Sequence, residues 1–349
     1  MPPLDYCGKY ILAPMVRSGE LPTRLLSLKY GADIVWSPEI VDKKIIGCTR
    51  VINSLHNCVE FWKEQANNKP STLVFKKHLE HERSKIVFQL GTSSPELAVE
   101  AARVVAADVD GIDVNSGCPK HFSIHSGMGA ALLRTPDKLV LILEELVANI
   151  GKKYDIGISV KIRLLDTPEE TFVLVQRLVK TGISALTVHC RKVPMRPRES
   201  PIPELYLAKI ADICHEAGVI CIANGGMKYR SDLPRMRDTY GVDSIMIAEA
   251  AESNMSCFAA AHRPEDLVPW KSLAEEYILQ AAQVGNIFSN TKYLLAQIIP
   301  GKAKEYQQVV RCRSYEEVIK RKVEQSNDRL QAKQLRTKLE VEIPVSVAI

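Results

Sequence analysis

The chain has 349 residues, enough for one large barrel and an appended module, and its 46% hydrophobic and 25% charged residues are typical of a globular protein. No apolar stretch is long enough to cross a bilayer, the first residues carry no visible secretion or import signal, and the nine cysteines include no C-x-x-C pair. We therefore expect a protein with reduced thiols, no membrane span and no zinc ribbon, monomeric and located in the cytosol, with a nuclear share left open. The net charge of +5 allows an anionic ligand without requiring one.

Short apolar runs recur along the first three quarters of the chain, and each run ends in a polar or glycine-containing turn. The runs are almost continuously apolar rather than alternating, as in parallel strands that are covered on both faces. Helical stretches separate them, so eight units in succession predict an α/β fold of the (β/α)8 TIM-barrel type. A doubly wound open sheet is the competing architecture. The eight runs are residues 10–15, 32–36, 86–90, 111–115, 158–163, 185–189, 219–223 and 244–248.

The pattern changes after the eighth run to helices alone, predicted at residues 267–284, 290–299, 303–312 and 315–339. The expected organisation is therefore a catalytic barrel over residues 1–262, an all-α helical domain over 263–340 and a flexible tail over 341–349. Within the barrel, residues 53–84 form the longest interruption and predict an excursion near the rim.

One cysteine stands in a turn directly after the fourth predicted strand. The strand ends in Asn115, Gly117 follows, and Pro119 lacks a backbone N–H, so Asn115 and Cys118 leave the strand at a fixed point. A single cysteine is more often a small buried hydrophobe. Because the carboxyl ends of strands carry the active sites of TIM barrels, this turn favours a thiol aimed at a ligand.

The other strand ends carry a coherent set of residues. One apolar mouth is expected to hold an amide from Gln89, a cation from Lys161 and an imidazole from His189. These groups suit a planar, anionic cofactor with polar edges. Gly225 and Gly226 follow the seventh strand, where barrels often bind a phosphate on backbone amides. Together these residues predict a mononucleotide site. The predicted cofactor-binding residues are Ala13, Pro14, Met15, Gln89, Lys161, His189, Asn224, Gly225, Gly226, Ala248 and Glu249.

Each of these residues has an ordinary explanation when taken alone. Lysine and histidine at strand ends are often solvated, and glycine pairs mark most turns. The sequence shows no metal-binding constellation, no G-x-S-x-G and no G-x-x-x-x-G-K-[ST]. Metal hydrolysis, serine acyl transfer and P-loop chemistry are therefore disfavoured.

Over nearly its whole length the chain resembles the tRNA-dihydrouridine synthases, and most of all the eukaryotic enzymes that act at position 20 of the D-loop. The resemblance implies FMN as cofactor, NADPH as reductant, tRNA as substrate and a helical tRNA-recognition domain after the barrel. The chain is too short for the double-stranded-RNA-binding domain of animal relatives, so it resembles the fungal form. The resemblance is carried by residues 12–17, 113–120, 127–133, 160–163, 187–191, 222–226 and 290–295.

Reduction of the uracil C5=C6 bond needs a hydride at one carbon and a proton at the other. We interpret Cys118 as the proton donor, because a thiol of ordinary pKa is mostly protonated at neutral pH. Lys161 is expected against the pyrimidine edge of the flavin, and Asn115 and Arg163 against a flipped uracil. Basic side chains predicted to bind the RNA are Arg191, Lys192, Arg196, Arg198 and Lys292.

The chain departs from the family pattern at two places. Many relatives end strand eight with Gly-Arg, whereas this chain has Ala248-Glu249, so we expect Glu249 to contribute a backbone amide only. Arg17 replaces a smaller residue and suits a phosphate of either the RNA or FMN. Two other hypotheses stay open: a flavin barrel acting on a free pyrimidine, as in dihydroorotate-type enzymes, and a non-catalytic tRNA-binding protein.

Overall fold

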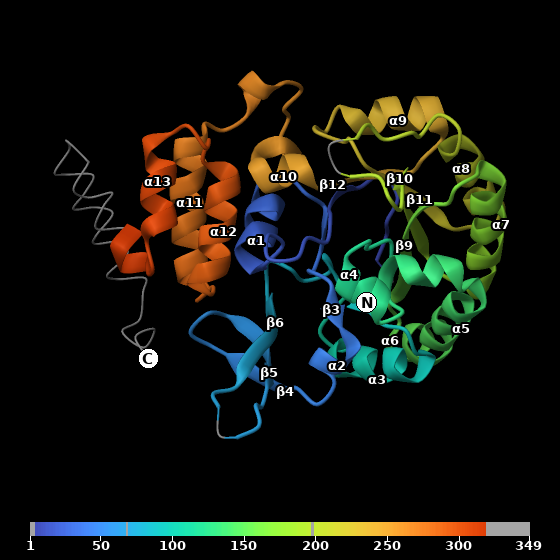
Figure 1. The fold of residues 1–349 in the computed structure, drawn as a ribbon, viewed down its shortest axis with the longest axis horizontal. Coiled ribbons are helices and arrows are strands. Elements are labelled where there is room, and N and C mark those ends of the chain that lie inside the picture. Colours follow the sequence, from blue (N-terminus) through green and yellow to red (C-terminus); the bar gives the residue numbers. More distant parts are fainter. Residues whose placement is uncertain (1–3, 68, 197–198, 319–349) are drawn as a thin grey trace.

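The computed structural model describes residues 4–67, 69–196 and 199–318, and its centre is a closed barrel of parallel strands (Figure 1). Each strand pairs with its neighbour, and pairing of β2 with β7 closes the ring. The predicted TIM barrel is therefore confirmed, and the open-sheet alternative is wrong. The strands are β1 (Tyr10–Leu12), β2 (Ile34–Trp36), β7 (Ile86–Gly91), β8 (Gly111–Ser116), β9 (Gly157–Leu164), β10 (Ala185–Lys192), β11 (Ile220–Asn224) and β12 (Ser244–Ile247).

Helices surround the barrel, and their apolar faces pack on the outward-facing Ile, Val and Leu side chains of the strands. The start of α7, for example, is stabilised by a capping box made by Thr167 and Glu170. The helices are α1 (Leu21–Lys29), α2 (Asp42–Ile45), α3 (Pro95–Val105), α4 (His121–His125), α5 (Pro136–Leu146), α6 (Lys152–Tyr154), α7 (Pro168–Leu178), α8 (Leu207–Glu216), α9 (Asp232–Tyr240) and α10 (Glu249–Ser253).

The amino-terminal segment plugs the barrel at the end away from the predicted site. Tyr6 is buried and its ring lies beside that of Trp36, with centroids 6.0 Å apart. Gly111 and Gly157 make room for it, because a Cβ at Gly111 would lie 2.5 Å from the Tyr6 hydroxyl. A closed lower end leaves the carboxyl ends of the strands as the open mouth.

The excursion predicted at residues 53–84 contains most of a second, antiparallel sheet. It comprises β4 (Thr49–Asn53), β5 (Cys58–Lys63) and β6 (Thr72–His78), in the order β4-β5-β6. A short strand, β3 (Ile40–Val41), precedes it and pairs with β7 at the mouth of the barrel. The small sheet thus projects from the barrel beside the helical region (Figure 1).

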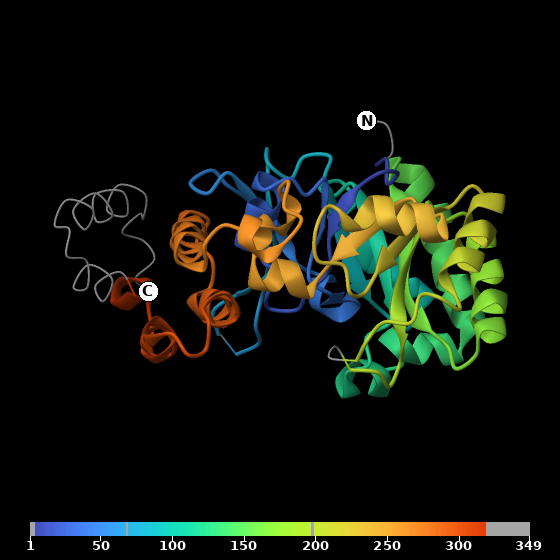
Figure 2. The same ribbon diagram turned by 90° about the horizontal axis from the view of Figure 1, so that it is seen from above.

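The carboxy-terminal region is helical, as predicted, with α11 (Trp270–Gln283), α12 (Phe288–Ile298) and α13 (Lys304–Arg311). These helices share an apolar core with Leu26 of α1 and with Met255, two residues inside the predicted barrel domain. Figure 2 shows the helices packed against the side of the barrel that α1 and α10 cover. The domain bounds stay a prediction; the tail, and most of the helix predicted at 315–339, lie outside the described residues.

Candidate active site

The Cys118 turn is built by the asparagine that precedes it. The Asn115 Oδ1 atom accepts hydrogen bonds from the backbone N–H groups of Gly117 and Cys118, both at 3.0 Å. Gly129 closes the turn from the other side, where its φ of +58° and its missing Cβ allow the backbone to approach Cys118 and the Ser123 hydroxyl. The turn therefore holds the half-buried Cys118 thiol in one place at the mouth.

A chain of buried polar side chains supports this turn from inside the barrel. Asn115 Nδ2 donates to Gln89 Oε1 at 3.1 Å, and Gln89 Nε2 donates to Asp113 Oδ2 at 2.8 Å. Ser159 Oγ donates to the other oxygen of Asp113 at 2.7 Å. Burial raises the pKa of Asp113 to about 6 against the effect of these hydrogen bonds. Gln89 thus orients Asn115; its contact with a cofactor stays a prediction.

Two cations follow on β9, whose Lys161 lies in register with Asn115. Burial lowers the pKa of Lys161 to about 8, and the neighbouring charge of Arg163 adds to this while Asp113 opposes it. Arg163 is 6% exposed; its Nη1 donates to the carbonyl oxygens of Lys192 and Met195, at 2.9 and 3.0 Å. Its buried Nε has no hydrogen-bond partner among the described residues, so this N–H is free for a ligand.

His189 and Arg191 are two positions apart on β10, so their side chains lie on the same face of the strand. Arg191 Nη1 donates to His189 Nε2 at 3.0 Å, and Arg191 Nε donates to the Glu199 carbonyl oxygen at 2.7 Å. Burial lowers the pKa of His189 far below its usual value, and the charges of Lys161, Arg163 and Arg191 lower it further. The imidazole is therefore neutral, with its proton on Nδ1.

Arg191 lies on a strand inside the mouth and not on the loop where it was predicted, so its contact with RNA stays a prediction. Its side chain is 5% exposed and lines a pocket inside the mouth instead of standing on an exposed loop. The alternation of side chains along β10 explains the difference, because β10 continues to Lys192 and residues 187, 189 and 191 therefore point to the same face.

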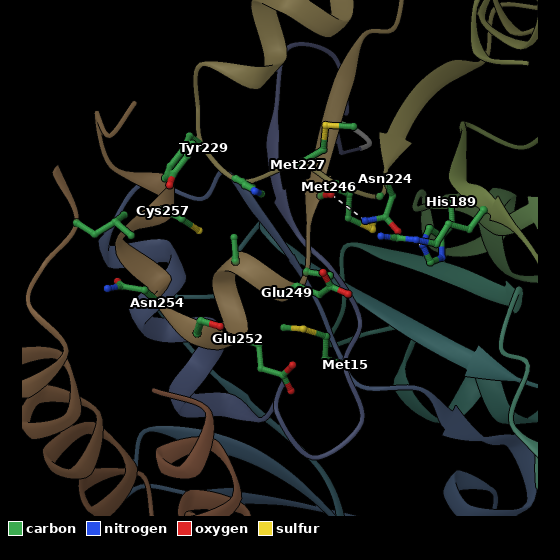
Figure 3. Close-up of a pocket in the computed structure, with 18 residues that line it drawn as sticks. Met15, His189, Asn224, Met227, Tyr229, Met246, Glu249, Glu252, Asn254 and Cys257 are labelled. Carbon is green, nitrogen blue, oxygen red and sulfur yellow. Dashed lines mark hydrogen bonds between the residues drawn. The ribbon is translucent and has the colours of Figure 1, made fainter. Parts of the chain in front are cut away.

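The pocket lies between the ends of β1, β10, β11 and β12 and helix α10 (Figure 3) and has a volume of about 460 Å³. Asn224 Nδ2 donates to the Met246 carbonyl oxygen at 2.8 Å, drawn as a dashed line in Figure 3, and so ties β11 to β12. The predicted site residues in its wall are Met15, His189, Arg191, Asn224, Gly225, Gly226, Ala248 and Glu249. Met227, Lys228, Tyr229 and Glu252 also line the wall and were not predicted.

The wall of this pocket has the features of an anion site. Gly225 and Gly226 have φ values of +106° and +79°, and a Cβ at Gly225 would lie 3.1 Å from His189 Cδ2. Backbone amides can therefore approach a ligand closely at this turn. Arg191 and Lys228 bring positive charge to the same wall. A cation three residues after a glycine turn is the sequence signal that would have pointed to Lys228.

Glu249 stands at the edge of the pocket with its side chain exposed. In Figure 3 it lies between Met15 and Asn224. Glu249 is the first residue of the short helix α10 and Ala248 precedes it, so this end of the helix lies at the pocket. That Glu249 contributes only its amide to a ligand stays a prediction.

The remaining predicted residues lie elsewhere. Ala13 is buried in the barrel and bonded through its N–H to the Ile247 carbonyl oxygen, and Pro14 lies between it and Met15. Lys192 Nζ donates to the Asp166 carbonyl oxygen, Arg196 is exposed, and Arg198 lies outside the described residues. Lys292 Nζ donates to the carbonyl oxygens of Val310 and Cys312, so its ammonium group caps the end of α13.

Among the described residues, no cluster of three or more His, Cys, Asp or Glu side chains has the arrangement of a metal site. In the same part of the chain, every helix is too short or too polar to cross a membrane.

The chain is similar to several proteins that are named as tRNA-dihydrouridine synthases. The tRNA-dihydrouridine(20) synthase (NAD(P)+) of Saccharomyces cerevisiae is 50% identical over 320 residues, covering 90% of this chain and 83% of that protein. Its Schizosaccharomyces pombe counterpart is 48% identical over 322 residues, 91% of this chain and 65% of that protein. A Homo sapiens protein named tRNA-dihydrouridine(20a/20b) synthase (NAD(P)+)-like is 28% identical over 249 residues, 71% of this chain and 70% of that protein. A family profile described as Dihydrouridine synthase (Dus) matches residues 11–344, and the chain belongs to this family.

Proposed function

We propose that this protein reduces the C5=C6 bond of a uridine in tRNA, at position 20 of the D-loop, to dihydrouridine. The observation that carries the proposal is the Cys118 thiol, fixed by Asn115 at a barrel mouth that also holds Lys161 and an anion pocket. Family membership supports the reaction. The choice of position 20 rests on identity, which is 50% and 48% to relatives named for that position and 28% to one named for 20a/20b.

The mouth fits FMN as the cofactor and NADPH as the reductant. Arg191, Lys228 and the amides of Gly225 and Gly226 would hold the phosphate, because they bring positive charge and exposed N–H groups to one wall. Met15 would pack on the ring system, and Lys161 would lie at its anionic edge. When bound, FMN supplies the hydride that the reduction needs.

Lys161 and His189 have different tasks because their charges differ. Lys161, with a pKa of about 8, is mostly charged at neutral pH and stabilises negative charge at the mouth. His189 is neutral, and its Nδ1–H would donate a hydrogen bond to a ligand without adding charge. Arg191 fixes that tautomer by donating to Nε2.

The uridine must leave its base stack to reach this mouth. Asn115 has one amide hydrogen engaged by Gln89 and a second that is available to a uracil carbonyl oxygen. Arg163 offers its unpaired Nε–H in the same region. With the base held between them, Cys118 donates a proton to the carbon that does not receive the hydride.

Positive charge around the mouth would bind the tRNA backbone. Lys192 and Arg196 lie on the strand and loop that follow His189, and Arg17 lies on the loop after β1. Arg17 stacks over the Tyr293 ring of α12 at 4.4 Å, so it stands where the barrel meets the helical region. Phosphate contacts of this kind give affinity that falls with salt but little base selectivity. An RNA contact by Lys292 would require it to leave the end of α13.

We also propose that the protein is a monomer located in the cytosol, with a nuclear share left open. All nine cysteines are free thiols, including the exposed Cys7, which suits a reducing compartment. Sedimentation of the protein with and without tRNA measures the oligomeric state, and fluorescent tagging in a yeast cell measures the location.

The test is reduction of unmodified tRNA by the purified protein with NADPH, with dihydrouridine quantified and mapped by mass spectrometry. We expect product at one D-loop uridine for the wild type and at least a hundredfold slower formation for Cys118→Ala with flavin still bound, about the contribution of a general acid. Cys7→Ala is the matched control, because it removes an exposed thiol far from the mouth. Undiminished activity of Cys118→Ala removes Cys118 from the mechanism, and reduction of a free pyrimidine instead of tRNA would favour the dihydroorotate-type alternative.

A further inference from the structure

A carboxyl group from another part of the barrel mouth lies beside Cys118. Glu39 belongs to the segment between β2 and β3, and β3 pairs with the end of β7 through Ile40 with Leu90 and Val41 with Gly91. The Glu39 carboxyl group occupies the space next to Gly91, where a Cβ atom would lie only 2.7 Å from Glu39 Oε1. That oxygen is shielded from solvent and has no hydrogen-bond partner among the described residues. A buried carboxyl oxygen left unpaired in this way needs an explanation.

The Cys118 thiol is the neighbour that Glu39 faces. β7 pairs with β8 through Leu90 and Val114, so the end of β7 that holds Glu39 lies beside the end of β8 that leads into the Cys118 turn. The two groups are close enough for each to affect the pKa of the other, and the Ser123 hydroxyl and the Lys120 backbone N–H lower the pKa of the same thiol. The Cβ position that Gly129 lacks is 3.0 Å from Cys118 Cβ and 2.5 Å from Ser123 Oγ, so these side chains are crowded together.

The charges around this thiol come from three elements. Lys120 lies on the turn itself, and Lys161 and Arg163 lie on β9. Each of these cations favours the thiolate, which cannot donate a proton. Glu39, from the β2–β3 segment, is the carboxyl group that opposes them, and Lys120 also faces Glu39.

We propose that Glu39 is a positioning residue for the acid Cys118, and that its carboxylate keeps the thiol protonated among the three cations until the uracil arrives. This inference rests on the proposed role of Cys118. In the donation step the S–H bond breaks, a C–H bond forms on the uracil, and the electron pair stays on sulfur. A thiolate beside a carboxylate is unfavourable, so the pair takes up one proton from water, through the Glu39 carboxyl, and the thiol is restored.

The ionisation of both groups is consistent with this geometry. Burial raises the pKa of the Cys118 thiol, and the charge of Glu39 raises it further. Burial also raises the pKa of Glu39, against the opposing effects of Cys118 and Lys120. The two groups together therefore retain a proton to a higher pH than either does in water.

The test measures the thiol directly, without relying on turnover. Cys118 is alkylated with iodoacetamide from pH 6 to 10 in the wild type, Glu39→Gln and Glu39→Asp, and the extent is read by peptide mass spectrometry with Cys7 as internal reference. We expect Glu39→Gln to react at lower pH, with about tenfold faster alkylation at pH 7.5 for each unit by which the thiol pKa falls. Glu39→Asp should lie between the two. The alkaline limb of dihydrouridine formation should move to lower pH in the same order.

Glu144→Gln is the matched control, because Glu144 is exposed on α5 and its loss should leave the alkylation profile unchanged. Identical Cys118 profiles in the wild type and Glu39→Gln, with circular dichroism and flavin content preserved in both, would overturn the inference. The two proposals fail in different experiments. Undiminished activity of Cys118→Ala would contradict the proposed role of Cys118, whereas the alkylation of Cys118 in the Glu39 variants does not depend on that activity.

Discussion

Lys161 keeps its charge at the mouth of the barrel at a cost in stability. Its pKa in the folded protein is about 8, below the ordinary value of 10.5, because burial disfavours the ammonium form. Below pH 8 the folded state contains the charged, poorly solvated group. As the pH rises from 8 to 10.5 the folded state releases its proton before the unfolded state does, so this cost disappears over that range.

Replacing Lys161 with Met should therefore stabilise the flavin-free protein and abolish catalysis. We expect the free energy of unfolding at pH 7 to rise by roughly 2 kcal/mol, with the gain shrinking above pH 8. Urea unfolding at several pH values measures the gain, and the tRNA assay measures the loss of activity. Lys180→Met, at an exposed position on the barrel surface, should change neither. A gain that is constant up to pH 10.5 would contradict the assigned cause.

The sequence predicted the site residues that follow directly from strand ends. Asn224 and Gly225 line the pocket because they are the last residue of β11 and the residue after it, where topology alone decides the location. His189 lines the same pocket from within β10. Arg191 was misplaced because the extra length of β10 could not be read from the sequence. Glu39 was missed because Cys118 is distant in the chain, and the two come together only through the pairing of β3 with β7 and of β7 with β8.

At the scale of elements, the parallel strands were predictable and the small antiparallel sheet was not. Barrel strands such as β8 and β9 are almost wholly buried, so they read as apolar runs. The β4 strand is exposed along nearly all of its length, and the small sheet shields charged side chains such as Glu60, which is buried, and Lys76, whose side chain is 10% exposed. Without an apolar run or a regular alternation, the sequence predicted only an excursion there.

A buried ion pair joins this small sheet to the helical region. Lys76 of β6 pairs with Glu60 of β5 at 2.7 Å and donates to the carbonyl oxygen of Val284, just after α11. Burial would raise the pKa of Glu60, but Lys76 and the donors Trp62 and Asn53 bring it below its ordinary value. The stabilisation is therefore present at neutral pH and is lost as the pH falls through the lowered pKa of Glu60.

Lys76→Met should destabilise the protein by about 3 kcal/mol at pH 7, because it leaves the Glu60 carboxylate buried without its cation. The loss should shrink towards pH 4 as the carboxyl group takes up a proton. Adding Glu60→Gln to Lys76→Met should recover most of the stability, since the uncompensated charge is then gone. Denaturant unfolding of the two single variants and the double variant measures the coupling, with the exposed Lys43→Met as control. Additive effects of the two substitutions would refute this account.

At the scale of the whole molecule, the barrel and the helical region share their stability. Leu26 and Met255 extend from the barrel into the apolar core formed by Leu273, Leu294 and their neighbours. Glu276 of α11 receives hydrogen bonds from Lys29 and Tyr30, and His56 Nδ1 lies 2.7 Å from the Gln283 carbonyl oxygen. The predicted boundary near residue 262 marks a change of element type, but apolar contacts cross it.

These contacts predict that the two parts unfold together. Leu26→Ala, on α1 of the barrel, should lower the free energy of unfolding by about 3 kcal/mol and should do so equally for both parts, because its side chain lies in the shared core. Hydrogen exchange of peptides from β8 and from α11 measures the two stabilities in one experiment. Leu141→Ala, at a largely exposed site on α5, is the control and should have little effect. If α11 alone lost protection in Leu26→Ala while β8 kept that of the wild type, the helical region would be a separately folding unit. Joint loss instead means that the position of the helices on the side of the barrel is set by the same core that holds the barrel together.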